Sequence, residues 1–261
     1  DTKPDKNHKS IFLIEIVTVD EGKEMELTYD QKVLLNNAAK RSFRDMADQD
    51  YLTARVCFKN NLPFQFLWMS QQAIEKYIKC ILLFNRVPVL KIGHNLVKGI
   101  DAINAIPYLK LDLSDKSIDF IKYLNDQGPN RYFQKVMYTR GLEIITLDRT
   151  VWELRRYCRL LDYQLKTPKG EVIDMLEVEL RTIRHTRNVP PHKHKIVGGY
   201  LEKRLKDNKY NHGSILTWKN FFFGKTKKNT IKIGRSMRTN FPTQHLHPES
   251  LQFFGKFFKI T

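Results

Sequence analysis

The residues with the most evident binding chemistry lie near the C-terminus of the chain, where aromatic and basic side chains alternate. Trp218 and three phenylalanines occupy residues 218–223, and a series of cations follows them: Lys225, Lys227, Lys228, Lys232, Arg235 and Arg238. Rings that stack on bases and cations that pair with phosphates are typical of single-stranded nucleic-acid binding. The alternative is that the rings dock this segment onto the rest of the protein while the lysines face water.

A second candidate site combines Lys79, His94, Arg131 and Tyr132. Glu75 and Lys79 are four residues apart and therefore share one face of a helix. Because arginine binds phosphate in a bidentate manner and a tyrosine ring stacks on a base, we expect Lys79 and Arg131 to face a nucleotide-binding cleft that His94 also contacts. The alternatives are a solvated Glu75–Lys79 pair, a histidine bonded to backbone at a helix start, and an Arg–Tyr pair that pins its own loop.

The pair His192 and His194 is the closest approach to a metal site, since imidazole suits zinc, nickel or copper. However, the sequence has no aspartate or glutamate between Glu179 and Glu202, and its three cysteines are far apart, at Cys57, Cys80 and Cys158. This pattern favours a basic surface loop. We therefore predict no metal site and no cofactor, and we interpret the cysteines as small core residues.

Positive charge is distributed unevenly along the chain. The 261 residues include 45 lysines and arginines against 28 aspartates and glutamates, a net charge of +17. Residues 1–165 carry +4, whereas residues 166–261 carry +13 and six of the eight histidines. Clustered cations gain affinity for a polyanion by releasing its counterions. The C-terminal part is therefore expected to bind a polyanion, with a solvated surface that aids solubility as the alternative.

Composition excludes several classes of protein. Hydrophobic residues make up 41% of the chain, enough for a packed core. Apolar runs such as residues 11–14, which stop at Glu15, fall far short of the ~20 residues that span a bilayer, and the first residues have no signal-peptide core. An odd number of cysteines without a C-x-x-C pair argues against a disulfide framework. We therefore expect a cytoplasmic protein without a membrane segment.

The spacing of apolar residues predicts that the first part of the chain is helical. Pro63 and Ser114 are suitable residues for helix starts. Ala73, Tyr77 and Ile81 share a helix face and should be core. Apolar residues recur every three or four positions over 30–60, 64–84, 95–105, 115–125 and 147–165, with a loop at 130–141.

The remaining segments are predicted to be mixed. We expect a helix over 171–184, strands over 214–223 and 230–237 joined by a basic turn, an amphipathic element over 249–260, and a strand over 11–19 that pairs with the C-terminal strands. The fold class is therefore mainly α. It consists of an antiparallel helical bundle over 30–166, an N-terminal extension over 1–29 and a smaller basic α+β appendage over 167–261.

Residues 40–165 resemble the HEPN family. Gln71-Gln72-Ala73-Ile74-Glu75-Lys76, with Lys79, is similar to the QQA-x-EK-x-x-K second helix of that family. Gly93-His94-Asn95-Leu96 is similar to its H-x-L helix start, and Asn130-Arg131-Tyr132-Phe133 lies where it often has an Arg-Tyr-Pro loop. The resemblance implies an antiparallel helical bundle that forms a homodimer.

Many HEPN proteins are metal-independent endoribonucleases in which an arginine is followed, after four to six residues, by a histidine at the dimer cleft. The expected region, 131–149, contains no histidine. A match by spacing is Arg187 with His192, a segment that lies outside the resemblance and contains Pro190 and Pro191. In a ribonuclease, Arg187 would stabilise charge on the scissile phosphate and His192 would act as general acid–base on the 2′-hydroxyl.

The sequence thus predicts a non-catalytic, HEPN-like protein that binds RNA or a nucleotide as a homodimer. A metal-independent ribonuclease of the HEPN type, in a toxin or phage-defence setting, is the alternative. A third possibility is a protein-interaction module whose basic tail binds an acidic partner.

Overall fold

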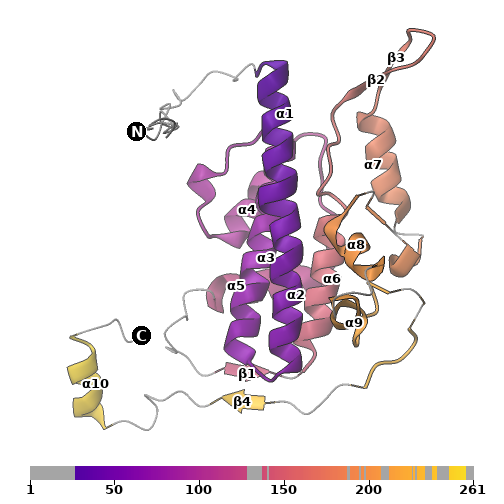
Figure 1. Cartoon of the computed structure of the whole chain (residues 1–261). Helices are drawn as coiled ribbons and strands as arrows, with labels where there is room; N and C mark the ends of the chain where they lie inside the picture. Colours follow the sequence, from indigo (N-terminus) through magenta and orange to yellow (C-terminus); the bar gives the residue numbers. More distant parts are fainter. Residues whose placement is uncertain are drawn as a thin grey trace, which may run out of the picture.

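The computed structural model describes residues 27–127, 137–139, 141–186, 189–193, 195–196, 198–206, 212–224, 226, 228–232, 237–239 and 247–256. Within these residues the protein is mainly helical, which confirms the mainly α fold class (Figure 1). The strand expected over 11–19, with its proposed pairing, lies outside the described residues.

The described chain opens with a long helical rod. It consists of α1 (Tyr29–Ala38), a π-helical segment (Ala39–Arg44) and α2 (Asp45–Lys59), which follow one another without a break. The Thr28 side chain caps α1 by accepting from the backbone N–H of Gln31, and the Gln31 side chain accepts from the Thr28 N–H. The helix expected over 30–60 is confirmed, but its π-helical turn was not expected.

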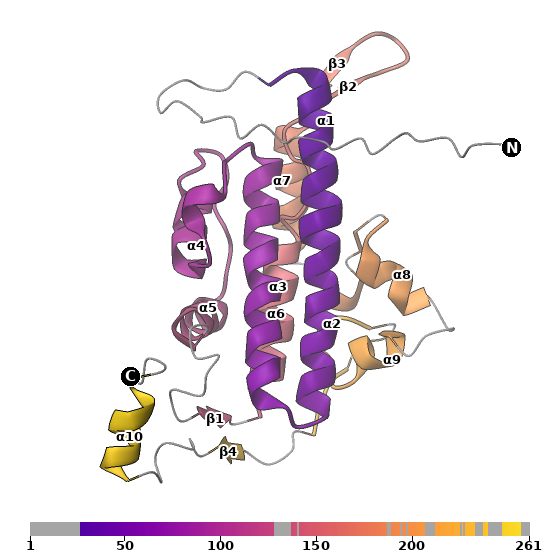
Figure 2. The same cartoon turned by 60° about the vertical axis from the view of Figure 1, so that its left-hand side comes forward.

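The central helix of the bundle is α3 (Pro63–Phe84), which packs against α2, α4, α5 and α6. Its predicted core face is confirmed, because Ala73, Tyr77 and Ile81 have no exposed surface. The next helices are α4 (Leu96–Asn104), capped by the Asn95 side chain, and α5 (Asp115–Gln127), both close to their predicted positions. Figure 2 shows these two helices beside α3, on the side away from α2.

The last long helix of the bundle, α6 (Glu143–Arg155), is shorter than the helix expected over 147–165. It begins four residues earlier and ends ten residues earlier than predicted. Cys158 and Leu161 beyond its end are nevertheless fully buried. The apolar pattern of the sequence continues past the end of the helix because residues of the irregular segment that follows are also buried.

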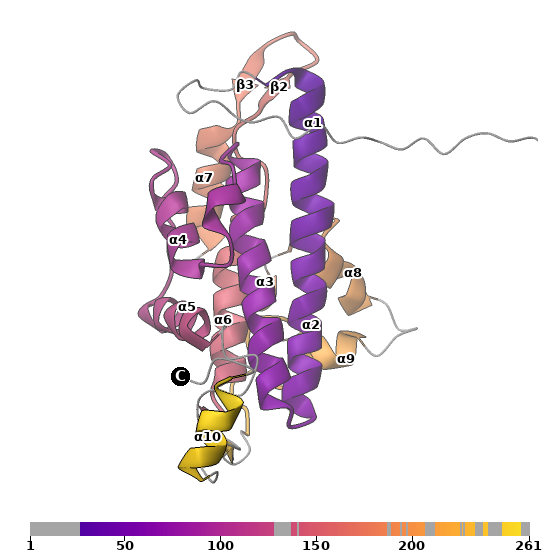
Figure 3. The ribbon, with the colours of Figure 1, turned by 90° about the vertical axis from the view of Figure 1, so that its left-hand side faces the viewer.

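A hairpin replaces the beginning of the helix expected over 171–184. Strand β2 (Gln164–Lys166) pairs antiparallel with β3 (Val172–Asp174), Leu165 lying opposite Ile173, and α7 (Leu176–His185) follows. The turn between the strands closes through the Gly170 N–H, which donates to the Thr167 carbonyl at 2.9 Å. In Figure 3 this hairpin projects beyond the end of the bundle at which α1 lies.

The strand expected over 214–223 is wrong, and the strand expected over 230–237 is described only at residues 230–232, which are irregular, and at Met237, which begins a short strand. Residues 212–217 form a short helix, α9 (His212–Thr217), and the described residues 228–232 contain no strand. Asn220 explains part of the difference, because its Oδ1 accepts the backbone N–H groups of Phe222 and Phe223 at 2.8 and 3.0 Å. These donors are therefore not available to a sheet.

The other C-terminal elements are short. Helix α8 (Tyr200–Lys206) precedes α9, and α10 (Pro248–Phe254) forms within the element expected over 249–260. Strand β4 (Met237–Thr239) pairs antiparallel with β1 (Met137–Thr139), a segment that was expected to be loop. Within the described residues, the strands of the C-terminal part 167–261 are β3 and β4, each of three residues, so its expected α+β character is limited.

A single hydrophobic core joins the bundle to the C-terminal helices. Leu201, Leu205 and Leu216 of α8 and α9 are buried in the same cluster as the residues of α3 and α6. The three cysteines are buried and unpaired, as the interpretation of these residues as core predicts. None of the helices in the described ranges combines the length and the apolar character that crossing a bilayer requires.

Candidate functional site

Two buried ion pairs join α2 to α6. Asp48 and Arg55 are seven residues apart on α2, and Asp148 and Arg155 are seven residues apart on α6, so each set shares one helix face. Arg155 binds Asp48, with Nε 2.8 Å from Oδ1 and Nη2 2.8 Å from Oδ2, and Arg55 binds Asp148. The reciprocal pairing means that the two helices run antiparallel.

Each buried aspartate also accepts a hydrogen bond from a tyrosine of the core. Tyr77 donates to Asp48 Oδ1 and Tyr51 to Asp148 Oδ1, both at 2.6 Å. Burial, followed by the charge of the neighbouring aspartate, raises the pKa of both tyrosines well above the ordinary value. Burial also raises the pKa of Asp148 to about 6, although the Arg55 charge acts in the opposite direction. The Asp148 carboxyl therefore titrates closer to neutral pH than an ordinary aspartate does.

Arg155 fastens α8 to the bundle. Its Nη1 and Nη2 donate to the two carboxylate oxygens of Glu202 at 2.7 and 2.8 Å, while its other donors hold Asp48. Glu202 also accepts the backbone N–H of Ile196 at 3.1 Å. Burial alone would raise the pKa of Glu202, but these interactions with Arg155 lower it below the ordinary value. Glu202 is thus an ionised carboxylate that is paired with Arg155 and shares this arginine with Asp48.

The close packing at this ion pair explains a glycine. A Cβ atom at Gly199 would lie 2.0 Å from Glu202 Oε2 and 2.8 Å from Arg155 Nη2. A side chain at this position would therefore push Glu202 away from its partner. The residue before α8 must be glycine if the ion pair is to form as observed.

Arg55 fastens α9 and the segment after it in a different manner. Its Nε donates to the Ile215 carbonyl at 3.0 Å, and Nη2 donates to the Trp218 carbonyl. Lys228 lies close to this network and donates to the Thr217 carbonyl. Burial, and then the charge of Arg55, lowers the pKa of Lys228. Lys228, predicted to contact nucleic acid, is therefore engaged in holding its own segment.

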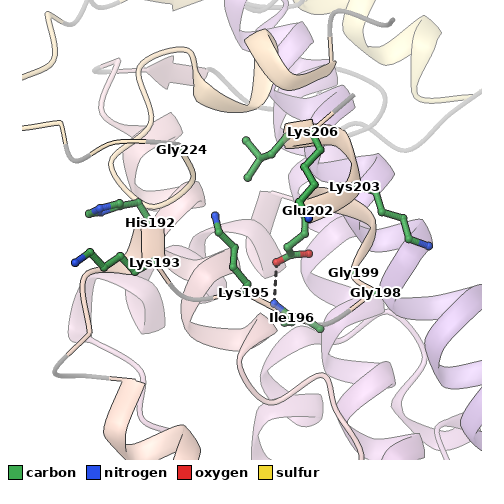
Figure 4. A pocket seen from close by; sticks show the side chains of 11 residues that line it. His192, Lys193, Lys195, Ile196, Gly198, Gly199, Glu202, Lys203, Lys206 and Gly224 are labelled. Carbon is green, nitrogen blue, oxygen red and sulfur yellow. Dashed lines mark hydrogen bonds between the residues drawn. The ribbon is translucent and has the colours of Figure 1, made fainter. Parts of the chain in front are cut away.

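A pocket of about 850 Å³ lies beside the Glu202–Arg155 pair (Figure 4). One wall is the segment that precedes α8, and another is α8 itself; Gly224 completes the lining. The pocket is strongly basic, and among its described lining residues Glu202 is the only carboxylate. The cationic or titratable basic side chains that line it are His192, Lys193, Lys195, Lys203 and Lys206.

The lysines of this pocket are not paired with any residue that the structure describes. No ion pair or hydrogen bond joins the side chains of Lys193, Lys195, Lys203 or Lys206 to another residue in the described part of the chain. Burial lowers the pKa of Lys195, and the positive charges of Arg155 and Lys206 lower it further against the opposing effect of Glu202. The pocket is thus a concentration of positive charge, which a bound anion would stabilise.

The first predicted site is brought together in part. Lys79 Nζ lies 2.7 Å from Glu75 Oε1, and His94 Nδ1 lies 3.0 Å from Glu75 Oε2. The Glu75 and Lys79 side chains are only 9% and 15% exposed, so they do not form the solvated surface pair that was the alternative to a cleft. Both candidate residues bind the same carboxylate, which counters their attraction for phosphate. Arg131 and Tyr132 lie outside the described residues, so the cleft they were expected to share with Lys79 stays a prediction.

The ribonuclease pair is described at only one of its two residues. His192 lies in a short 3-10 turn (Pro191–Lys193) and lines the basic pocket. Arg187 and His194 lie outside the described residues. Among the residues that are described, no three His, Cys, Asp or Glu side chains are arranged to hold a metal ion.

The aromatic segment 218–223 is docked on the bundle. Phe222 and Phe223 are buried, with ring centroids 5.8 Å from Trp152 and 5.7 Å from Tyr51. The Trp218 ring lies against the ammonium groups of Lys59 and Lys219, at 5.9 and 5.0 Å. The rings of Phe222 and Phe223 therefore dock this segment onto the bundle, as the alternative to base stacking predicts.

The cations that follow are described incompletely. Lys225, Lys227 and Arg235 lie outside the described residues. The backbone of Arg238 lies in β4, opposite Tyr138 of β1. Their proposed contact with nucleic acid stays a prediction.

The sequence reasoning missed the buried network and the pocket cations. A signal for the network was present, because Asp48, Tyr51 and Arg55 follow a spacing of three and four residues that Asp148, Val151 and Arg155 repeat. Charged residues on the apolar face of a helix need buried partners, and two matched helices could supply them for each other. The pocket lysines had no comparable signal, since charge density alone does not show which lysines converge.

Comparison of the chain with family models, with curated proteins and with solved structures gives no match.

Proposed function

We propose that this protein is a non-catalytic, HEPN-like protein that binds RNA or a nucleotide through phosphate-directed contacts. The observation that carries the proposal is the basic pocket beside α8, which is lined by four lysines, by His192 and by one carboxylate, Glu202, that is paired with Arg155. Ligand pockets commonly have volumes of about 300–1,000 Å³. A volume of about 850 Å³ is therefore consistent with a nucleotide or a short stretch of an RNA chain.

The distribution of charge supports the same proposal. Residues 1–165 are close to neutral at +4, and the buried aspartates Asp48 and Asp148 are paired with arginines. Residues 166–261 carry +13. The attachment of α8 and α9 to the bundle uses Arg55 and Arg155 of the bundle itself. The pocket lysines are not used for this attachment and remain available to a ligand.

The resemblance of residues 40–165 to the HEPN family supports the family assignment and a homodimer. The arrangement in which α2 runs antiparallel to both α3 and α6, and the meeting of Glu75, Lys79 and His94, agree with a shared helical scaffold. We propose the family and the dimer, like the ligand, on this basis.

Salt dependence of RNA binding tests the proposal. Binding of a mixed-sequence single-stranded RNA to the full chain should weaken steeply as salt increases, with a slope of about −0.7 for each phosphate neutralised. The triple variant Lys195→Gln, Lys203→Gln and Lys206→Gln should reduce this slope by about two. The matched control, Lys110→Gln with Lys166→Gln and Lys169→Gln, removes the same charge from exposed positions outside the pocket and should leave the slope nearly unchanged.

Two outcomes would contradict the proposal. A flat salt response, or the absence of RNA binding, would eliminate nucleic-acid binding and leave the interaction with an acidic protein as the remaining function. An equal loss of slope in both triple variants would show that RNA binds through general surface charge and not through the pocket.

A ribonuclease of the HEPN type is the second candidate, favoured by the position of His192 in the lining of the basic pocket. In this function a phosphate held by the lysines would bring a ribose 2′-hydroxyl near the imidazole. Incubation of the protein with mixed RNA in the presence of EDTA tests it. Cleavage that is abolished by His192→Ala would support the assignment, whereas cleavage that survives this substitution would eliminate it.

A further inference from the structure

We infer that the basic pocket beside α8 recognises a chain of consecutive phosphates, such as the triphosphate of a nucleotide or of an RNA 5′ end, and does not recognise the base. This inference rests on the proposed function, since it names the chemical group that the same pocket would bind. A triphosphate occurs in both ligand classes of that function, at the 5′ end of an RNA and in a nucleotide.

The first argument is the spatial distribution of the cations. Lys203 and Lys206 are three residues apart and therefore extend from neighbouring positions on α8. His192, Lys193 and Lys195 come from the segment on the other side of the pocket, and Figure 4 shows Lys195 projecting between His192 and Glu202. Charges on two facing walls can pair with several phosphates at once.

The second argument is the scarcity of side chains that read a base. Bases are recognised by stacking on aromatic rings or arginine planes and by hydrogen bonds to their edges. The described lining contains no phenylalanine, tyrosine, tryptophan or arginine, and no asparagine, glutamine, serine or threonine. His192 is the one described lining side chain whose ring could stack on a base, and stacking does not discriminate among bases. Nearby rings are engaged elsewhere: Phe222 and Phe223 pack on the bundle, and Tyr200 lies against Arg204 at 4.7 Å.

The third argument is the shape of the backbone. Gly198, Gly199 and Gly224 line the pocket without side chains, so the ligand can approach the main chain closely. The remaining lining residues, Ile196 and Leu205, are apolar and could contact a sugar or a base without discriminating among bases. The pocket therefore supplies many positive charges and few directional polar contacts.

Glu202 provides a test with an opposite sign. Its carboxylate repels a bound polyphosphate, although the guanidinium of Arg155 offsets part of this repulsion. Glu202→Gln removes this repulsion and retains an oxygen that accepts from Arg155. The variant should therefore bind polyphosphate more tightly, while Lys195→Gln should bind it more weakly. A general loss of folding would weaken binding in both variants, so the pair of opposite effects is specific to the electrostatics of the pocket.

The experiment is calorimetric titration of the full chain with inorganic tripolyphosphate, ATP, GTP, CTP, UTP, AMP and adenosine. We expect the four nucleoside triphosphates to bind within about twofold of one another, because the electrostatic contribution does not depend on the base. Tripolyphosphate should bind comparably, AMP more weakly by about fivefold for each charge pair it lacks, and adenosine not at all. Lys195→Gln should weaken tripolyphosphate binding by about fivefold, and Glu202→Gln should strengthen it by a similar factor.

A second arm identifies the source of the phosphates. RNA of one sequence is compared with a 5′-triphosphate and with a 5′-hydroxyl. Tighter binding of the 5′-triphosphate RNA would identify an RNA end as the ligand. Equal binding of the two RNAs, together with competition by free ATP at the same site, would identify a free nucleotide.

The inference and the proposed function fail in different ways. If RNA binds with a steep salt dependence but tripolyphosphate neither binds nor competes, the inference is overturned and the proposed function stands. If one nucleoside triphosphate binds at least about tenfold more tightly than the others, base recognition is present and the inference is also overturned. If neither RNA nor tripolyphosphate binds, both are overturned.

Discussion

Arg55 and Arg155 occupy equivalent positions on two antiparallel helices, yet they hold their appended segments by different chemistry. Both are buried, and both pair with an aspartate of the opposite helix. Arg55 uses its remaining donors for the main-chain carbonyls of Ile215 and Trp218. Arg155 uses its remaining donors for a second carboxylate, that of Glu202.

This difference determines how strongly each attachment depends on sequence. A carbonyl acceptor is present at every residue, so the attachment of α9 requires only that the backbone has the observed path. The attachment of α8 requires a carboxylate at one position and a glycine at another, Gly199. The pocket lies beside the attachment that depends on side chains, and its electrostatics are therefore coupled to one ion pair.

Removal of each arginine is expected to give the largest effects and to separate the two attachments. Arg155→Met leaves Asp48 and Glu202 without a counter-ion and should lower the free energy of unfolding by about 3–5 kcal/mol. Arg55→Met should cost less, because it leaves one carboxylate, Asp148, whose pKa of about 6 lets it take up a proton. Urea unfolding at pH 7 measures both values. Equal losses, or a larger loss for Arg55→Met, would contradict the comparison.

The pH dependence of stability should reveal Asp148. Its pKa rises from 3.8 in the unfolded chain to about 6 in the folded protein, so the folded state binds its proton more tightly. The resulting stabilisation is complete below about pH 4 and is lost as the pH rises through 6, a change of roughly 3 kcal/mol. In unfolding experiments from pH 4 to 8, Asp148→Asn should lack this decrease. The exposed control, Asp119→Asn, should retain it.

The glycines before α8 provide a smaller and more local test. Gly199→Ala should lower the free energy of unfolding by about 1–3 kcal/mol, because the new Cβ displaces Glu202 from Arg155. Gly198→Ala is the matched control: its Cβ meets open space, but its φ of +69° strains any residue with a side chain, at about 1 kcal/mol. Thermal unfolding compares the two. A smaller loss at Gly199 than at Gly198 would show that Glu202 moves without losing its ion pair.

The smallest expected effect is at His94, which contacts Glu75 of α3. His94→Ala should change the free energy of unfolding by less than about 0.5 kcal/mol, since the ring is 72% exposed and Glu75 retains Lys79. The same unfolding measurement at pH 7 applies. A loss above about 1 kcal/mol would mean that the histidine, and not only Lys79, is needed to balance the buried Glu75.

The sequence predicted the parts of the fold that depend on regular apolar spacing. The second helix and its buried face of Ala73, Tyr77 and Ile81 agree with the structure, as do the helix starts at Pro63 and Asn95. The predictions were wrong where buried side chains come from irregular backbone. Leu161 after α6 and Phe222 after α9 are core residues, although neither lies in a helix or strand.

The candidate site was predicted less well, for a physical reason. Sequence spacing indicates which residues share a helix face, and it correctly placed Lys79 beside Glu75. It does not indicate which residues of separate segments converge, and the pocket combines His192, Lys195 and Lys206 from an irregular segment and a short helix. The excess charge of residues 166–261 located the region but not the arrangement.

The reciprocal pairing of α2 and α6 also has a consequence for the register of the bundle. A slide of one helix by a single turn, about 5.4 Å, would separate Asp48 from Arg155 and Asp148 from Arg55 at the same time. Apolar side chains tolerate such a slide because one leucine packs much like another, whereas four unpaired buried charges do not. Among the alternative alignments of these two helices, the ion pairs therefore select one, and the positions of α8 and of the pocket follow from that selection.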